Sequence, residues 1–120
     1  MAAKKLKEII NWTYNNKPIT DISQTPDKSI SLIYKIYLLD GTGRYYIGRK
    51  TMRKPNYTSG TLKGQSKVEY PWKTYCGSSK ELLEILKLGV PYRKEILYFC
   101  FSKAETTYRE TKEILCSGAL

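Results

Sequence analysis

Apolar residues recur along the chain at the spacing of a helix or of a strand, and the changes of spacing mark the expected elements. Residues 3–14 carry apolar side chains at helical spacing with lysines between them, which predicts a short amphipathic helix. Pro18 lies beyond its end. The polar residues 19–28 are expected to form a loop that leads into the first strand.

Three runs rich in β-branched and aromatic residues predict strands. Residues 31–39 and 44–48 are separated only by the glycine-containing stretch 40–43, so we expect these two runs to form a β-hairpin. The third run, 92–101, is rich in isoleucine, leucine, tyrosine and phenylalanine.

A serine followed three residues later by a glutamate marks two helix starts. Ser78 with Glu81 precedes a leucine-rich stretch that ends at Gly89, which predicts one helix. Ser102 with Glu105 repeats the pattern and opens a final helix. The core-facing stripe of this final helix is expected to comprise Ala104, Tyr108, Thr111 and Leu115.

The segment 49–77 keeps neither the strand period nor the helix period, and it is strongly basic. It holds seven lysines and arginines against a single acid, Glu69. A long irregular segment in a small domain is typically functional or disordered. Aromatic residues interleave with the cations, and this favours a nucleic-acid surface over a solvated basic loop, because cations contact phosphates while rings stack on bases or sugars.

The fold class predicted by this order of elements is α+β: a small antiparallel three-stranded sheet with flanking helices. A chain of 120 residues has room for one small domain. Residues 1–30 are expected to form an N-terminal helix and lead-in, and residues 31–120 the main domain.

Charge narrows the range of partners. Twenty-one lysines and arginines against 11 acids give a formal net charge of +10, which favours a polyanion such as nucleic acid. The chain has neither an apolar run of about 18 residues nor the N-terminal pattern of a signal peptide, so we expect no membrane partner and an intracellular, cytoplasmic location.

The chain contains no histidine, which excludes Ser–His and Cys–His nucleophiles and any nuclease with a histidine base. Cys76, Cys100 and Cys116 are widely spaced, which argues against disulfides and a zinc site and predicts buried free thiols.

A pair of tyrosine motifs carries a family resemblance. The first predicted strand contains "LIYKIYL" with Tyr34, and the second contains "YIG" with Tyr46. These motifs resemble the GIY-YIG nuclease superfamily over residues 31–116, although Leu32 stands in the place of the first motif's glycine. "PWKTYCGSSKEL" and "YRKEIL" are similar to a phage-associated branch of that superfamily.

The resemblance implies an endonuclease that hydrolyses double-stranded DNA with Mg²⁺ or Mn²⁺, working in a phage-infected bacterial host or on a mobile element. It points to Glu110 in "YRETKEI" as the metal ligand, to Tyr34 as the base and to Tyr46 as the residue that positions water or phosphate. A catalytic arginine is also implied, and both Arg49 and Arg53 are candidates.

The chemistry sets a condition on the tyrosines. A phenol of pKa about 10 accepts a proton near neutrality only if neighbouring cations or a metal lower its pKa, and the basic residues after "YIG" are expected to provide that setting. The residues expected to bind DNA are Lys50, Lys54, Lys63, Lys67, Trp72 and Lys73.

Two other functions remain open from the sequence. One is a non-catalytic basic nucleic-acid-binding protein on a degenerate GIY-YIG fold, and the other is a protein-interaction or RNA-associated module whose tyrosines fill the core. If the protein selects a cutting site, residues 1–30, the 49–77 segment or a homodimer is expected to supply the selectivity.

Overall fold

The computed structural model describes residues 10–58 and 61–117. The elements in chain order are β1 (Trp12–Tyr14), β2 (Lys17–Ile19), the 3-10 turn η1 (Ile22–Gln24), β3 (Ser31–Leu38), β4 (Tyr45–Thr51), β5 (Arg53–Thr58), β6 (Thr61–Glu69), α1 (Lys80–Lys87), β7 (Tyr92–Cys100) and α2 (Lys103–Ser117).

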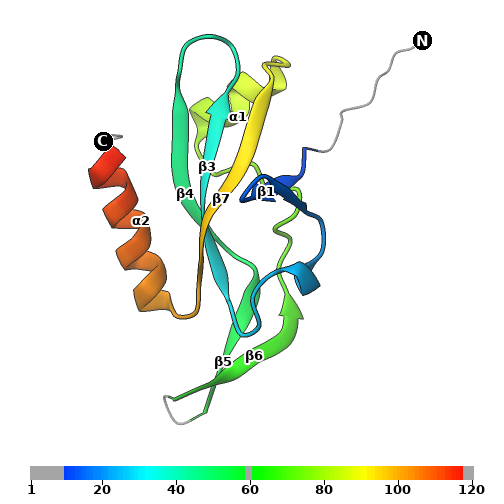
Figure 1. The fold of residues 1–120 in the computed structure, drawn as a ribbon, viewed down its shortest axis with the longest axis vertical. Helices are drawn as coiled ribbons and strands as arrows, with labels where there is room; N and C mark the ends of the chain where they lie inside the picture. Colours follow the sequence, from blue (N-terminus) through cyan, green and yellow to red (C-terminus); the bar gives the residue numbers. More distant parts are fainter. Residues whose placement is uncertain (1–9, 59–60, 118–120) are drawn as a thin grey trace, which may run out of the picture.

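A five-stranded mixed sheet forms the centre of the molecule, with strand order β2-β1-β7-β3-β4 (Figure 1). β3 pairs antiparallel with both β4 and β7, as the predicted hairpin and third strand require. β1 adds to the other side of β7 in parallel. The α+β class is therefore confirmed, but the expected three-stranded antiparallel sheet is wrong, because two short N-terminal strands extend it.

The N-terminal part of the sheet replaces the end of the expected helix. Residues 3–9 of that predicted helix lie outside the described residues, but Trp12–Tyr14 form β1, which pairs antiparallel with β2. Asn15 and Asn16 connect the two strands with φ values of 52° and 67°. Asparagine tolerates this left-handed conformation, so the pair makes a tight hairpin turn that the apolar spacing did not reveal.

The segment 49–77 is more regular than its sequence predicts. β4 continues to Thr51, and the chain then forms β5 and β6, a separate two-stranded antiparallel sheet. In Figure 1 this β5–β6 ribbon extends from the lower end of the main sheet. Its register shifts between Arg53 and Pro55 and again between Pro55 and Tyr57. Such irregularities break the alternation of polar and apolar residues by which strands are recognised.

One face of the main sheet packs a single apolar core. Its buried members are Trp12, Ile19, Leu32, Tyr34, Ile36, Leu38, Met52, Trp72, Leu82, Ile96 and Phe99. Helix α1 contributes Leu82 to this core, and Gly89 follows its end with a φ of +87°, as predicted. Its N-cap is Ser79 instead of Ser78, because the Ser79 hydroxyl accepts a hydrogen bond from the Leu82 amide at 3.2 Å.

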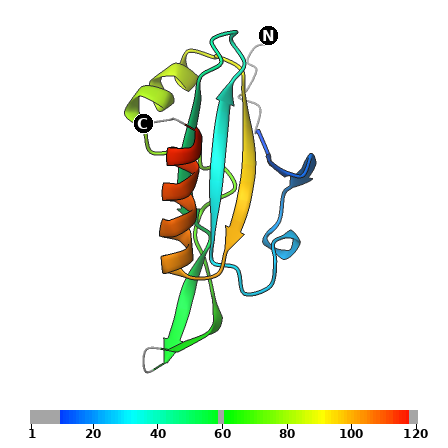
Figure 2. The same cartoon turned by 60° about the vertical axis from the view of Figure 1, so that its left-hand side comes forward.

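The other helix, α2, runs alongside the sheet (Figure 2) and does not pack through its predicted stripe. All four residues of that stripe are exposed, with Tyr108 and Leu115 each 61% exposed. The strands under α2 present the buried Ile33 together with several polar groups. Glu113 accepts a hydrogen bond from the Tyr98 hydroxyl at 2.9 Å, and Thr106 is buried against Ser31. The predicted stripe is wrong, because the side of α2 that faces the sheet carries Thr106 and Glu113, whose hydrogen-bonding partners lie on the strands.

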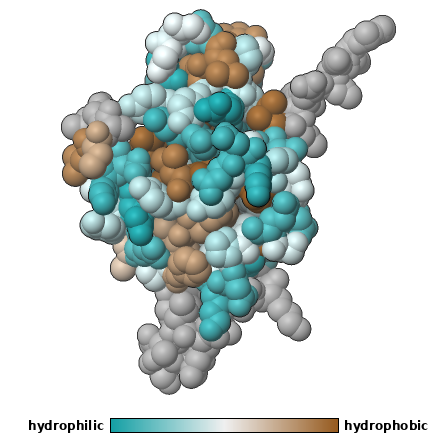
Figure 3. Space-filling model, in the orientation of Figure 1, coloured by the Kyte–Doolittle hydropathy of each residue, from teal (hydrophilic) through white to brown (hydrophobic). Residues whose placement is uncertain are grey.

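Hydrophilic residues cover most of the face shown in Figure 3, with apolar residues in separate patches.

All three cysteines are free, but only Cys100 is buried, so the expectation of buried thiols is wrong for the exposed Cys116 and the half-buried Cys76. Within the described residues, no helix is long and apolar enough to cross a membrane.

Candidate active site

A cleft of 340 Å³ lies beside β4, the edge strand of the main sheet. Its walls come from β3, β4, the segment before α1, and both helices. The lining residues are Tyr34, Tyr46, Ile47, Gly48, Arg49, Gly77, Ser78, Ser79, Leu82 and Glu110. The cleft therefore brings together both motif tyrosines, one of the two candidate arginines and the predicted metal-binding glutamate.

Gly48 is required at this edge by the side chain of Tyr34. The two residues are directly paired between β3 and β4, and a Cβ added at Gly48 would overlap the hydroxyl end of the Tyr34 ring. The ring thus crosses the edge strand where that strand has no side chain. The glycine therefore makes room for a tyrosine, and β4 continues past it to Thr51.

Arg49 and Glu110 reach the cleft from the opposite face of the sheet. Successive residues of a strand point to opposite faces, so Arg49 lies on the α2 side while Gly48 and Tyr34 lie on the core side. The Arg49 Nη1 donates a hydrogen bond to the Thr107 hydroxyl at 2.8 Å, and its Nε lies 3.4 Å from the Glu110 Oε1. The cleft therefore runs around the edge of the sheet.

Tyr34 is a neutral phenol in the free protein. Its side chain is 5% exposed and packs against Trp12 and Tyr75, with ring centroids 5.5 and 5.9 Å away. Burial, followed by Tyr75 and then by Glu110, raises the pKa of Tyr34 well above its usual 10.0. The expected lowering of this pKa by neighbouring cations is wrong for the free protein, and Lys50 lies over the Tyr75 ring instead.

Tyr46 lies at the α1 side of the cleft. Its side chain is half-buried on β4, where it is directly paired with Ile36 of β3. Burial and then the nearby Glu81 raise its pKa above 10.0. Tyr46 is therefore also a hydrogen-bonding phenol, not an ionised group, near neutral pH.

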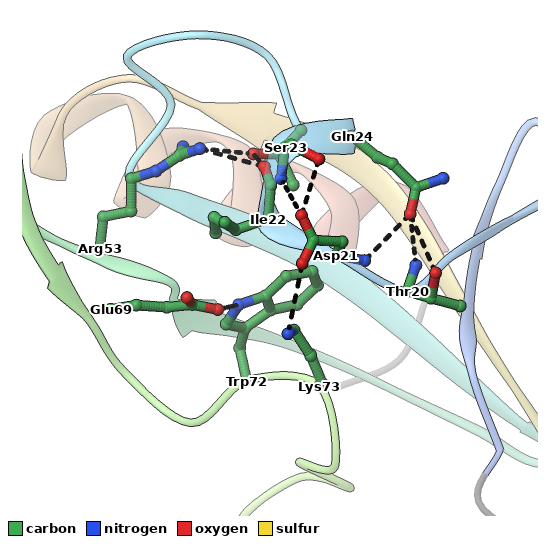
Figure 4. A network of polar contacts seen from close by, with 10 residues as sticks. Thr20, Asp21, Ile22, Ser23, Gln24, Arg53, Glu69, Trp72 and Lys73 are labelled. Atoms are coloured by element: carbon green, nitrogen blue, oxygen red, sulfur yellow. Dashed lines mark hydrogen bonds and ion pairs between the residues drawn. The ribbon is translucent and has the colours of Figure 1, made fainter.

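Arg53, the other candidate arginine, is not brought to the cleft. It is 7% exposed, and its guanidinium donates to the Ser29 carbonyl at 2.6 Å and to the Thr25 hydroxyl at 2.9 Å. A further bond of 3.2 Å reaches the Ile22 carbonyl, as Figure 4 shows. Arg53 therefore holds the chain around η1 in place, which corrects its assignment as a catalytic candidate.

Two predicted DNA-binding residues also have structural roles. Trp72 is fully buried, and its indole N–H donates to Glu69 at 2.6 Å, so it is unable to stack on a base. Lys73 forms an ion pair of 3.8 Å with Asp21 (Figure 4). The alternation of aromatic and basic residues in the sequence did not distinguish buried rings from exposed rings, because rings of both kinds stand between the cations of the same segment.

The remaining predicted DNA-binding lysines lie along β4 and the ribbon. Lys50 is half-buried on β4, and Lys54 is exposed on β5. Lys63 and Lys67 belong to β6, and their side chains lie outside the described part of the structure.

The segment directly before α1, residues 77–79, is a part of the cleft that was not among the predicted site residues. The cleft is lined there by Gly77, Ser78 and Ser79. Gly77 adopts a φ of +97°, and a Cβ added to it would contact Leu82 and the Tyr34 hydroxyl. The sequence "YCGSS" contained an indication of this part of the cleft, because a glycine precedes the two serines at the helix start. Thr107, which binds Arg49, gave no signal, because an exposed threonine on a helix is unremarkable.

The donor set of the cleft fits a magnesium-type ion better than zinc. Among the lining residues, Glu110 is the only carboxylate, and its side chain is 26% exposed. Across residues 10–58 and 61–117, no group of three or more histidine, cysteine, aspartate or glutamate side chains is placed to hold a metal. Mg²⁺ commonly binds through one or two carboxylates, substrate phosphates and waters, so one glutamate in an open cleft suits it.

The cleft lining places one arginine and several hydroxyl groups around a single carboxylate, a set that favours chemistry on a phosphate. The class defined by this fold and cleft is a small nuclease-type domain. The chain belongs to the GIY-YIG nuclease superfamily, because the family model described as "Putative endonuclease segE, GIY-YIG domain" matches residues 12–120. This match includes β1 and β2, beyond the region that the motifs covered. Searches of curated proteins and of solved structures give no significant match.

Proposed function

We propose that the protein is a metal-dependent endonuclease that hydrolyses phosphodiester bonds of double-stranded DNA. Membership of the GIY-YIG superfamily supports the nuclease class. The observation that carries the proposal is the meeting of Tyr34 with the Arg49–Glu110 pair in one cleft at the open edge of the sheet. An edge strand leaves this side of the sheet accessible to a substrate as large as a duplex.

Arg49 is the residue we assign to the scissile phosphate. Its side chain is 50% exposed, and Thr107 and Glu110 each engage one of its nitrogens. A guanidinium has five N–H donors in a planar fork, so donors remain for two phosphate oxygens. Thr107 and Glu110 would fix the plane of the guanidinium before DNA binds.

Glu110 is the residue we assign to the metal ion. A divalent cation bound there would supply charge stabilisation to the phosphate and to the departing oxygen. Glu110 also contacts Arg49, so the carboxylate and the guanidinium hold each other in position on the same side of the cleft.

Tyr34 and Tyr46 would act first as hydrogen-bonding groups. The raised pKa of Tyr34 means that its hydroxyl orients the attacking water or a phosphate oxygen while it remains protonated. It would accept a proton only if a cation bound in the cleft lowers that pKa. Tyr46, on the α1 side, would contact the phosphate.

DNA on either side of the cleft would contact the basic strand and ribbon. Lys50 and Lys54 follow Arg49 along the chain, and Lys63 and Lys67 belong to the returning strand of the ribbon. Phosphate contacts of this kind give affinity that depends on salt and little on sequence.

One observation keeps a second function in view. The raised pKa of Tyr34 disfavours its use as a base in the free protein, and a protein that only binds nucleic acid needs no base there. Binding without strand cleavage is therefore the outcome that would replace the endonuclease proposal.

The test is nicking of supercoiled plasmid with Mg²⁺ or Mn²⁺ by the wild type and three variants. Glu110→Gln and Tyr34→Phe are each expected to lower the rate about 100-fold or more, in the range of lost proton-transfer or charge-stabilising groups. Glu113→Gln is the matched control, because Glu113 lies on the same helix but contacts Tyr98 outside the cleft lining. Circular dichroism would confirm equal folding.

Metal-dependent nicking that both cleft variants lose and the control keeps would support the proposal. Salt-dependent binding of DNA by all four proteins, with no nicking in either metal, would instead favour the non-catalytic binding protein.

A further inference from the structure

Lys94 is a buried lysine that the proposed chemistry does not use. It lies on β7, where it is paired with Trp12 of β1 on one side and with Ile36 of β3 on the other. It is 1% exposed. Burying an ammonium group this fully costs free energy unless hydrogen bonds replace its water, so its contacts indicate what it stabilises.

The contacts of Lys94 all lead to one segment of the chain. Its Nζ donates to the Tyr75 carbonyl at 2.7 Å and to the Lys73 carbonyl at 3.1 Å. The same Nζ lies 4.3 Å from the centre of the Trp12 ring, whose indole N–H donates to the Trp72 carbonyl at 2.8 Å. Side chains of two sheet strands, β1 and β7, therefore donate hydrogen bonds to three carbonyls between residues 72 and 75.

The segment held in this way, residues 72–78, forms part of the cleft. The Tyr75 ring packs edge-on against the Tyr34 ring, and Tyr75 is also the main neighbour that raises the pKa of Tyr34. Gly77 and Ser78 line the cleft directly. The position of the Tyr34 hydroxyl therefore depends on a segment that Lys94 anchors.

We propose that Lys94 is a positioning residue of the cleft: its buried ammonium fixes the backbone at Lys73 and Tyr75 and thereby sets Tyr75 against Tyr34. As a role in cleavage this rests on the proposed endonuclease function, but the anchoring itself can be measured without DNA. Hydrogen bonds from a charged donor are about twice as strong as neutral ones, so the charge strengthens the anchor.

The surroundings of Lys94 place its change of charge near physiological pH. Burial lowers the pKa of Lys94 from 10.5 to about 8. The facing groups are the Trp12 ring from β1, the two carbonyls and the Cys76 thiol from segment 72–78, and Ile36 from β3. Above that pH the amine is neutral, and the hold on the segment weakens.

The experiment compares the wild type with Lys94→Met, which fills a similar volume without a donor, and with Lys17→Met, which removes the charge of an exposed lysine on β2. Amide hydrogen exchange of residues 73–78 is expected to be about tenfold faster in Lys94→Met, as the loss of one or two hydrogen bonds predicts, and unchanged in Lys17→Met. Equal exchange in all three proteins would overturn the proposal.

A pH titration of the wild type, followed by NMR, tests the anchoring by Lys94 even if Lys94→Met does not fold. The Lys94 Nζ resonance and the Tyr75 and Gly77 amide shifts are expected to titrate together near pH 8. Tyr75 and Gly77 amide shifts that do not follow the Lys94 titration would overturn the anchoring.

A measurement of DNA cleavage distinguishes failure of this proposal from failure of the proposed endonuclease function. If the wild type cuts DNA, Lys94→Met should lower kcat with KM little changed, and the wild-type rate should fall above about pH 8 while the rate of the variant lacks that step. Unchanged kcat would refute the catalytic part of the inference. If the wild type does not cut, the proposed function fails, and the exchange and titration still decide the anchoring.

Discussion

At Gly48, a missing side chain lets a residue of the buried strand β3 reach the open edge of the sheet. Tyr34 belongs to the apolar core through Trp12, yet its hydroxyl end lies over the edge strand and lines the cleft. The two halves of the superfamily motif are thus a single steric unit. The tyrosine needs the glycine to reach the cleft, and the three atoms nearest to a Cβ added at Gly48 all belong to Tyr34.

A double-mutant cycle tests this unit. Gly48→Ala is expected to destabilise the wild type by about 1–3 kcal/mol, because the added methyl group forces the Tyr34 ring to move. In a Tyr34→Leu background, where no ring crosses the strand, the same change should be neutral or slightly stabilising, since alanine loses less entropy than glycine in a strand. Urea unfolding of the four proteins gives the coupling. Equal costs in both backgrounds would contradict the steric account.

At the scale of elements, helix α2 shows why an apolar period can mislead. Its residues at helical spacing face solvent, while Glu110 and Glu113 face the sheet because Arg49 and Tyr98 offer them partners there. The side of the helix that the sequence marks as polar is the side that forms the cleft. A carboxylate such as Glu110, on the packed face of a helix, therefore looks like a surface residue in the sequence.

The β5–β6 ribbon is the other element whose role is visible only in three dimensions. Its base is fixed by the buried Arg53, and Met52, which is fully buried in the core, precedes it directly. The rest of the ribbon extends from the main sheet and has lysines on both strands (Figure 1). An anchored, basic, projecting ribbon is well suited to contact a duplex beside the cleft.

Removal of charge from the ribbon tests this role. Lys63→Gln combined with Lys67→Gln should weaken binding to double-stranded DNA and reduce the slope of log affinity against log salt by up to about 2, since each phosphate contact contributes about 0.9. The control is Lys17→Gln combined with Lys87→Gln, two exposed lysines of β2 and α1. Fluorescence anisotropy over a salt series gives the slopes. Identical slopes for the two double variants would exclude the ribbon as a DNA contact.

At the scale of the whole molecule, buried Lys94 and Tyr34 and half-buried Tyr92 contribute to the dependence of stability on pH. The pKa of Lys94 is lower in the folded protein than its usual 10.5, so between about pH 8 and pH 10 the unfolded chain binds more protons and stability rises with pH. The pKa values of Tyr34 and Tyr92 are raised above 10.0, mainly by burial. Above pH 10 the folded chain therefore binds more protons, and stability falls.

We expect the free energy of unfolding to gain about 2 kcal/mol from Lys94 between pH 8 and pH 10 and to decline at higher pH. Lys94→Met should lack the gain and keep the decline, because only the lysine has been removed. Urea unfolding at half-unit steps of pH for the two proteins isolates this contribution from the general effect of net charge. Parallel curves between pH 8 and pH 10 would show that Lys94 has its ordinary pKa in the folded protein.

Local patterns in the sequence determined most of the secondary structure of this protein and the candidate residues of its cleft. The hairpin of β3 and β4, the strand β7, the two helices and the superfamily motifs are all encoded by residues close together in the chain, because capping, turn chemistry and period act over a few residues. Charge alone indicated a polyanionic partner. The same local information located Tyr34, Tyr46, Arg49 and Glu110 as candidates.

Only the tertiary structure decided how those residues meet. Arg49 and Arg53 are equivalent in sequence, but the cleft receives one and the core receives the other, because the face on which a side chain lies depends on strand register. Trp72 became core, and Lys94 became an anchor, through contacts with residues about 20 to 80 positions away. Such long-range contacts are set by packing of the whole sheet, which no local pattern records.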